Sequence, residues 1–200
     1  GERFLEVAEQ VSRRKPIIAF KSGVTAAGAS AASSHTGSLA GADVAYQAAF
    51  ARTGVVRAQT FEQMFEFATA FSSQPLPKDG RVAVITNAGG PGIMPTDAIE
   101  LSGMTMARLS DGLKERLAAG LPDAASVKNP VDVLGDALAD RYKDAIDAVV
   151  AAPEVDAVIV VLTPQAMTDA VGTAQAVIDA KGEKPILCCF MGGMRSEERR

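Results

Sequence analysis

Strand and helix patterns alternate along the whole chain, and this alternation constrains the fold more than any other feature. The clearest strand is Ala157–Leu162, an unbroken apolar run typical of the centre of a parallel sheet covered on both faces. Helical patterns of about 10–15 residues separate such strands, which indicates βαβ units. The sequence therefore predicts an α/β fold with parallel sheets and helices on both faces. We expect strands over 16–21, 55–58, 81–86, 104–109, 157–162 and 185–190, and helices over 2–14, 39–52, 61–71, 93–102, 111–121, 137–152 and 168–180.

Two domains are predicted, because one stretch alone has the composition of a linker. Residues 72–80 are polar and contain two prolines and a glycine. We expect a first domain over 1–72, a linker over 73–80 and a second domain over 81–200. The chain starts with Gly1 rather than Met and opens directly on a helical pattern, so we expect a piece of a longer polypeptide or a processed chain.

Charge and composition exclude several classes of function. The net charge is -4, there is no tryptophan, and lysine and arginine form no cluster, which argues against a nucleic-acid partner. No apolar run approaches the ~18 residues of a membrane span. The only cysteines, Cys188 and Cys189, are adjacent in a predicted strand and would point to opposite faces. We expect them to be small buried apolar residues of a cytoplasmic protein.

The only histidine, His35, lies among small and hydroxyl-bearing residues. Residues 23–31, between the first predicted strand and the helix that follows His35, are small, and we predict a long loop here. Long loops in compact domains are often functional. Two interpretations remain open from the residues alone. His35 is either a loop residue hydrogen-bonded through Ser33 or Ser34, or a side chain that carries a group to another element.

A glycine-rich turn, residues 87–92 (NAGGPG), follows one predicted strand and precedes a helix. Glycines allow close approach of backbone N–H groups to a ligand, and a helix N-terminus adds unsatisfied donors. The turn therefore indicates a phosphate cradle, although tight strand–helix turns also need glycine for steric reasons. It matches neither the dinucleotide fingerprint nor the P-loop, so we expect no nucleotide here. The candidate ligands are Asn87, Gly89, Gly90 and Gly92.

Other polar or glycine-rich loops are predicted at the same edge of the sheet, where ligands of open α/β sheets gather. Asn129 and Asp132 form one possible cleft, although Asn129 would equally cap a turn before Pro130. Residues 163–168 and 191–194 follow two further strands. One histidine and two adjacent cysteines cannot build a zinc site, and no hydrolase triad is evident.

Five motifs in order resemble the NDP-forming acyl-CoA synthetases, the ADP-forming acetyl-CoA synthetases related to succinyl-CoA synthetase. They are KPIIAFKSG (15–23), SSHTGSLAG (33–41), ITNAGGPG (85–92), NPVD (129–132) and LTPQAMTD (162–169). The resemblance implies two flavodoxin-like domains, the first represented over 1–72 by its C-terminal part. It also implies that His35 is phosphorylated on a loop that includes Ser34, Thr36, Gly37 and Ser38. The turn at 87–92 would hold phosphate near it.

The family interconverts acyl-CoA, ADP and phosphate with the free acid, CoA and ATP, through an acyl phosphate and a phosphohistidine. A neutral imidazole is nucleophilic near pH 7, which suits this relay. CoA, ATP or ADP, Mg²⁺ and phosphate are implied for the whole enzyme, and no cofactor for this part alone. The CoA-binding and ATP-grasp domains are expected elsewhere in the protein or on a partner subunit. Alone, this chain should be inactive, and a homodimer could complete its first sheet.

Two alternatives remain. The same modules occur in lysine acetyltransferases, in which the synthetase part senses ligands. A non-catalytic α/β module for subunit docking is the third possibility. The acyl acid and the nucleotide base cannot be read from the sequence.

Overall fold

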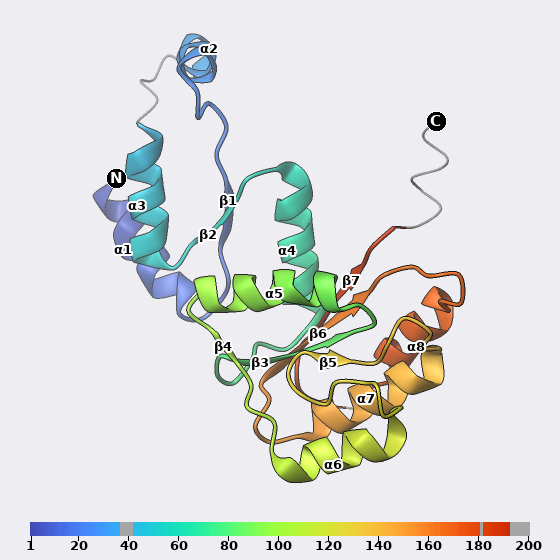
Figure 1. Cartoon of the computed structure of the whole chain (residues 1–200). Coiled ribbons are helices and arrows are strands. Elements are labelled where there is room, and N and C mark those ends of the chain that lie inside the picture. Colours follow the sequence, from blue (N-terminus) through green and yellow to red (C-terminus); the bar gives the residue numbers. More distant parts are fainter. Residues whose placement is uncertain (37–41, 181, 193–200) are drawn as a thin grey trace. The chain divides into compact units, whose positions relative to one another are not determined.

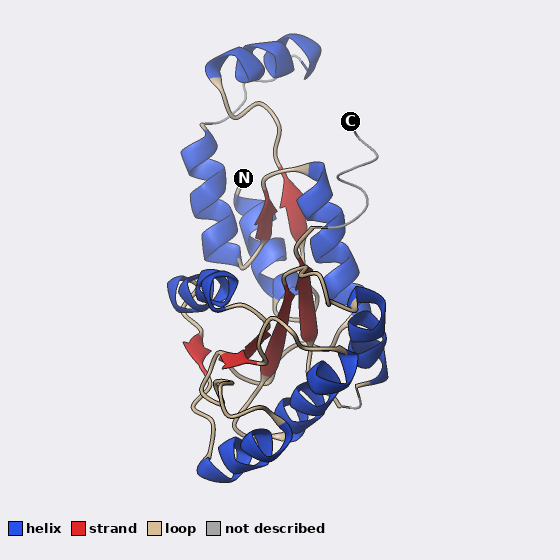
Figure 2. Cartoon of the chain, turned by 45° about the vertical axis from the view of Figure 1, so that its right-hand side comes forward, coloured by secondary structure: helices blue, strands red, loops and turns tan. Residues whose placement is uncertain are grey.

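The computed structural model describes residues 1–36, 42–180 and 182–192, apart from the side chains of Ser33, His35 and Thr36. The chain divides into two units, Gly1–Ser73 and Gln74–Arg200 (Figures 1 and 2). Each unit contains parallel strands with helices beside them, which confirms the predicted fold class. In the described ranges, no helix combines the length and apolar character needed to cross a bilayer.

The first unit is a small two-stranded sheet with helices. Strands β1 and β2 pair in parallel, with Ile18 opposite Val56. Gly54 ends the helix before β2 in the left-handed conformation (φ 70°), as its position after the helical pattern predicts. The elements are α1 (Glu2–Ser12), β1 (Ile18–Phe20), α2 (Ala26–Thr36), α3 (Asp43–Thr53), β2 (Val56–Ala58) and α4 (Phe61–Ser73).

Both faces of this small sheet carry helices. On one face Ala8 of α1 and Phe50 of α3 form a buried cluster with Val55, against Ile17 and Ala19. On the other face α4 contacts both strands, and the rings of Phe20 and Phe61 lie 4.5 Å apart. Because successive side chains along β1 point to opposite faces, this strand packs against helices on both sides of the sheet.

Two predictions for this unit are wrong. Residues 26–31, predicted as loop, belong to helix α2, because alanine has the highest helix propensity and outweighs the glycines and serines around it. The helical spacing of Phe61, Phe65 and Ala68 predicts that they form the inward face of α4, but all three are exposed, with Phe65 at 65 %, even though the Phe61 ring contacts Phe20. A pair of three-residue strands is too narrow to cover a whole face of this helix.

The second unit contains the larger sheet, and all its strand pairs are parallel. Strand β3 pairs with β6 on one side and with both β4 and β5 on the other, and β7 lies at the edge beside β6. The elements are β3 (Arg81–Thr86), α5 (Gly89–Leu101), β4 (Thr105–Met106), α6 (Asp111–Gly120), β5 (Val131–Asp132), α7 (Ala139–Ala151), β6 (Ala157–Leu162), α8 (Ala170–Asp179) and β7 (Ile186–Phe190).

Alternate residues of the central strands support two layers of helices. Val82 and Val84 face α5 and pack with Ile99, whereas Ala83 and Ile85 face the larger cluster formed with α6 and α7. Figure 1 shows α5 on one side of this sheet and α6 and α7 on the other. Tyr142 shares one side of α7 with Ile146 and Val149, and all three side chains are completely buried.

The prediction that the cysteines are buried is wrong. Cys188 and Cys189 are both exposed and free. They belong to β7, which has a neighbouring strand on one side only, so this edge of the sheet lacks the cover that an interior strand receives.

Candidate functional site

The carboxyl ends of the strands in the second unit bring several loops together. A Cβ on Gly89, at the start of α5, would lie 3.9 Å from the Asp132 carboxylate at the end of β5. A Cβ on Gly192, beyond β7, would lie 3.0 Å from Pro164, beyond β6. The polar and glycine-rich loops predicted at this edge are therefore neighbours in pairs.

The start of α5 presents two backbone donors. Ala88 is the N-cap, and its N–H already donates to Thr86 Oγ1 at 3.1 Å. Pro91 has no N–H to offer. Gly89 and Gly90 are both exposed, and within the described part of the chain their N–H groups have no acceptor. They point the positive end of the helix dipole toward solvent, an arrangement suited to an anion.

Gly92 has a different role from the other glycines of this turn. Its N–H donates to the Ala88 carbonyl at 3.2 Å, so it is not available to a ligand. A Cβ at this position would lie 3.0 Å from Thr86 Cγ2 and 3.8 Å from Pro130. Gly92 therefore allows α5 to approach the sheet closely, which is the steric use of glycine. Of the glycines predicted to bind phosphate, Gly89 and Gly90 therefore remain as candidate donors.

The side chain of Asn87 is held by the neighbouring strand rather than directed at a ligand. It is 2 % exposed. Its Nδ2 donates to the Thr163 carbonyl at 2.8 Å, and the Thr163 N–H donates to its Oδ1 at 2.8 Å. We call this pair of hydrogen bonds the Asn87 clasp. Because both polar atoms of this buried amide bond to Thr163, Asn87 does not offer the side-chain contact to phosphate that its place in the motif predicts.

Asn129 is likewise committed to the backbone of the sheet. Its Oδ1 accepts from Val84 N–H at 2.9 Å, and its Nδ2 donates to the carbonyls of Val82 (2.9 Å) and Ala107 (3.0 Å). Asn129 thus fills the gap beside β3 between β4 and β5. These bonds join Asn129 to strands distant in sequence, so its side chain neither caps the local turn before Pro130 nor turns into a cleft.

Asp132 keeps one oxygen near the start of α5. Its Oδ1 accepts from Leu134 N–H at 2.9 Å, which stabilises the positive φ of 72° at Leu134. Its Oδ2 is the atom that faces Gly89. Asp132 therefore lies beside Gly89, whereas Asn129 serves the strands.

Tyr142 is a neighbour of the site that sequence reasoning treated only as core. Its hydroxyl donates to the Val161 carbonyl at 2.8 Å. Burial raises the pKa of Tyr142, the Asp132 charge adds to the rise, and a hydrogen bond with the Asn87 backbone opposes it. A tyrosine on the inner side of an amphipathic helix gives no sequence signal for this connection.

The segment around His35 lies in the first unit. The backbone of His35 and Thr36 belongs to α2. Ser34 is exposed, and its hydroxyl donates to the Ser30 carbonyl at 3.1 Å. Gly37 and Ser38, also predicted to support the histidine, lie outside the described residues. The stretch leading to His35 is therefore helical rather than an extended loop.

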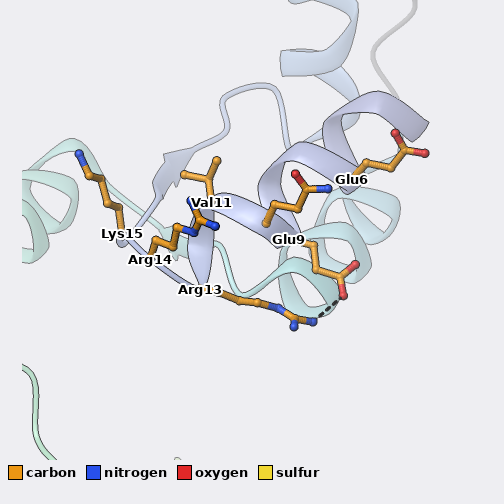
Figure 3. A pocket seen from close by; sticks show the side chains of 7 residues that line it. Glu6, Glu9, Val11, Arg13, Arg14 and Lys15 are labelled. Atoms are coloured by element: carbon orange, nitrogen blue, oxygen red, sulfur yellow. Dashed lines mark hydrogen bonds and ion pairs between the residues drawn. The ribbon is translucent and has the colours of Figure 1, made fainter.

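A pocket of about 760 Å³ lies elsewhere in the first unit, along the second half of α1 and the residues after it (Figure 3). Arg13 turns toward Glu9, with which it forms an ion pair of 3.2 Å, while Lys15 points the other way. Its charged groups do not converge on one point, so it is not the candidate site.

Comparison with known proteins identifies the family. Residues 1–71 match the family described as the succinyl-CoA ligase like flavodoxin domain, and residues 82–199 match the Ligase-CoA domain. The chain belongs to the CoA-ligase family. This result confirms the resemblance inferred from the sequence motifs.

Relatives with known names are ADP-forming ligases. The chain is 44 % identical to the α subunit of acetate–CoA ligase [ADP-forming] II of Pyrococcus furiosus, over 100 % of this chain and 45 % of that protein. It is 37 % identical to the 4-hydroxybutyrate–CoA ligase [ADP-forming] of Nitrosopumilus maritimus, over 96 % of this chain and 28 % of that protein. This CoA-ligase chain therefore spans less than half of the length of these relatives.

A solved structure gives the same result for the fold. The acetyl-coenzyme A synthetase 1 of Ca. Korarchaeum cryptofilum, in complex with phosphate and ADP, superposes with a TM-score of 0.86 at 36 % identity. The match covers 98 % of this chain and 43 % of that one.

Proposed function

We propose that this chain is the part of an ADP-forming acyl-CoA synthetase that carries the phosphohistidine and one phosphate-binding helix. The complete enzyme interconverts acyl-CoA, ADP and phosphate with acid, CoA and ATP. The observation that carries the proposal is the start of α5, where the exposed N–H groups of Gly89 and Gly90 have no acceptor in the described chain. These donors suit the charge of an inorganic phosphate or of a phosphorylated imidazole.

His35 is the proposed phosphoryl carrier. Nδ1 or Nε2 of its neutral ring attacks the phosphorus of the acyl phosphate, the carboxylate leaves, and the phosphoryl group later passes to ADP. In this scheme the α5 N-terminus holds the phosphate while it is transferred. The motif around His35 and the ligase names of the relatives support this assignment.

This proposal also assigns each region of the chain to a domain of the enzyme. Residues 1–72 form the C-terminal part of a flavodoxin-like domain, residues 73–80 a linker, and residues 81–200 a second such domain. Two observations support these limits: the first compact unit ends at Ser73, and the family matches cover residues 1–71 and 82–199. The CoA-binding and ATP-grasp domains, with Mg²⁺ and nucleotide, are partners in the same protein or on another subunit.

Substrate and location are less constrained. The relatives include ligases for acetate and for 4-hydroxybutyrate and a trans-feruloyl-CoA synthase, so we propose a carboxylic acid as the substrate. The free, exposed cysteines fit a reducing compartment such as the cytoplasm. The uncovered edges of the first sheet are consistent with a homodimer or with cover by partner domains.

Labelling the complete protein that contains this chain tests the proposal. Incubation with γ-labelled ATP and Mg²⁺ should give an acid-labile, base-stable label on the protein, and His35→Ala should abolish it. Ser34→Ala is the matched control and should keep the label, because the hydroxyl of Ser34 donates to the Ser30 carbonyl of its own helix and this bond needs no part of the His35 ring. A wild-type protein that takes up no label, with its ATP-grasp domain intact, would refute the catalytic proposal in favour of a sensing or docking module.

A further inference from the structure

The Asn87 clasp continues the pairing of β3 and β6 beyond the last residues that pair through the main chain. The register of the two strands runs from Val82 opposite Ala157 to Thr86 opposite Val161. At the next residue the side chain of Asn87, rather than its peptide group, supplies one donor and one acceptor to Thr163. An asparagine amide has the same donor and acceptor pair as a peptide group and can replace it in this way.

This substitution releases the backbone from the strand at the point where α5 must begin. Ala88, directly after Asn87, is still extended (φ -152°, ψ 126°) and acts as the N-cap. Gly89 and Gly90 then form the first turn with their N–H groups outward. A main-chain pair at residue 87 would keep the chain in the plane of the sheet, whereas a side-chain pair allows it to turn away.

The end of β6 is bonded by a second buried side chain as well. The Tyr142 hydroxyl donates to the Val161 carbonyl at 2.8 Å, two residues before Thr163. Asn87 and Tyr142 are thus both tied to the end of the same strand. The two glycine donors come two and three residues later, too close for the chain to absorb a shift at Asn87.

We propose that Asn87 is a positioning residue for the phosphate site. It does not touch the anion, but its clasp to Thr163 determines where the N–H groups of Gly89 and Gly90 lie. This inference rests on the proposed function, because it concerns the phosphate which that function assigns to the start of α5. Loss of the clasp should weaken phosphate binding more than ADP binding.

Steady-state kinetics of the complete enzyme, in the direction that consumes acyl-CoA, phosphate and ADP, test the inference. Asn87→Ser removes both hydrogen bonds and adds no charge. The KM for phosphate should rise by about tenfold or more, since displacement of a binding group by about 1 Å is costly, while the KM for ADP stays within about twofold. Asn87→Gln keeps the amide on a side chain one methylene longer, and should raise the KM for phosphate in the same selective way if Asn87→Ser does not fold.

Asp156→Asn is the matched control for stability. Asp156 is a buried side chain that ties together the same two strands at their opposite ends, where its Oδ2 accepts from the Arg81 N–H at 3.0 Å. This variant should lower the thermal midpoint without changing the KM for phosphate.

The outcomes separate the two proposals. A selective rise of the KM for phosphate in the Asn87 variants supports positioning. An unchanged KM for phosphate in folded Asn87 variants, or an equal rise in Asp156→Asn, would overturn it while leaving the enzyme function intact. Wild-type protein without synthetase activity or phosphohistidine would instead refute the proposed function. In that case the clasp can still be tested by measuring how much phosphate raises the thermal midpoint of wild type and of Asn87→Ser. An equal rise in the two proteins would overturn the inference.

Discussion

At each end of the β3–β6 pair a buried side chain joins the two strands, but one of these side chains is charged and the other is neutral. At the amino end the Asp156 carboxylate accepts from the Arg81 N–H (3.0 Å), Nε (2.7 Å) and Nη2 (2.8 Å). At the carboxyl end the Asn87 amide exchanges two hydrogen bonds with Thr163. In both cases a buried side chain bonds the backbone of the adjacent strand or the residue next to it.

The difference lies in charge and in the segment after each junction. The amino end is an ion pair, and both strands begin there. The carboxyl end is neutral and leads at once into Gly89 and Gly90. The Asp132 carboxylate already faces Gly89, and an aspartate at position 87 would add a second negative charge near the proposed phosphate donors, whereas the Asn87 amide adds none. This difference agrees with our proposal that the neutral clasp positions ligand-binding groups, whereas the charged pair stabilises the sheet.

Tyr142→Ala should have the largest effect on stability. The completely buried ring packs under the carboxyl end, and its removal leaves a cavity that costs about 4 kcal/mol in the free energy of unfolding. Tyr142→Phe, the matched control, loses only the hydrogen bond to Val161 and should cost about 1 kcal/mol. Urea denaturation of the transition that reports on residues 74–200 measures both. Equal costs for the two variants would show that the ring is not part of a rigid core.

Asp156→Asn should have an intermediate effect that depends on pH. The hydrogen bonds from Arg81 lower the pKa of Asp156 below its ordinary value of 3.8. The unfolded chain therefore binds more protons than the folded chain as pH falls through 3.8, and stability is lost there. At neutral pH the variant should have a thermal midpoint lower by about 5 °C. This deficit should shrink in acid, because the wild type then loses the same interaction.

The control for that pH dependence is Asp136→Asn. Asp136 pairs with Arg141 at 2.6 Å, but its side chain is 58 % exposed, and exposed pairs contribute little. Thermal midpoints measured from neutral pH into acid compare the two variants with wild type. A deficit of Asp156→Asn that stays constant with pH would contradict the role given to its charge.

Much of the second unit can be predicted from sequence, because its patterns are strong and local. The apolar runs of β3 and β6 locate these strands to the residue, and Ser110, a residue type favoured at helix starts, caps α6 by accepting from Leu113 N–H. Prediction fails where local preferences compete. Residues 26–36 contain loop-forming glycine and serine, but also enough alanine to make a helix.

The site is predictable in place but not in the roles of its residues. The glycine turn is recognisable because it lies between a strand and a helix. Which of its groups remain free depends on partners distant in sequence, such as Thr163 for Asn87 and Pro130 for Gly92. The predicted burial of the cysteines fails for a similar reason, since an apolar run does not reveal whether its strand lies at the edge of the sheet.

The smallest predicted effect separates two glycines of the carboxyl end that look equivalent in sequence. In Gly92→Ala the new methyl group would lie 3.0 Å from Thr86 Cγ2, so the variant should lose about 1 kcal/mol through overpacking, despite the better helix propensity of alanine. In Gly90→Ala no atom lies within 4 Å of the new group, and stability should rise by roughly 0.5 kcal/mol through reduced freedom of the unfolded chain. Urea midpoints of the two variants, measured side by side, provide the test. If Gly92→Ala were as stable as Gly90→Ala, Thr86 would have moved aside, and the close approach of α5 to the sheet would not be what requires glycine at residue 92.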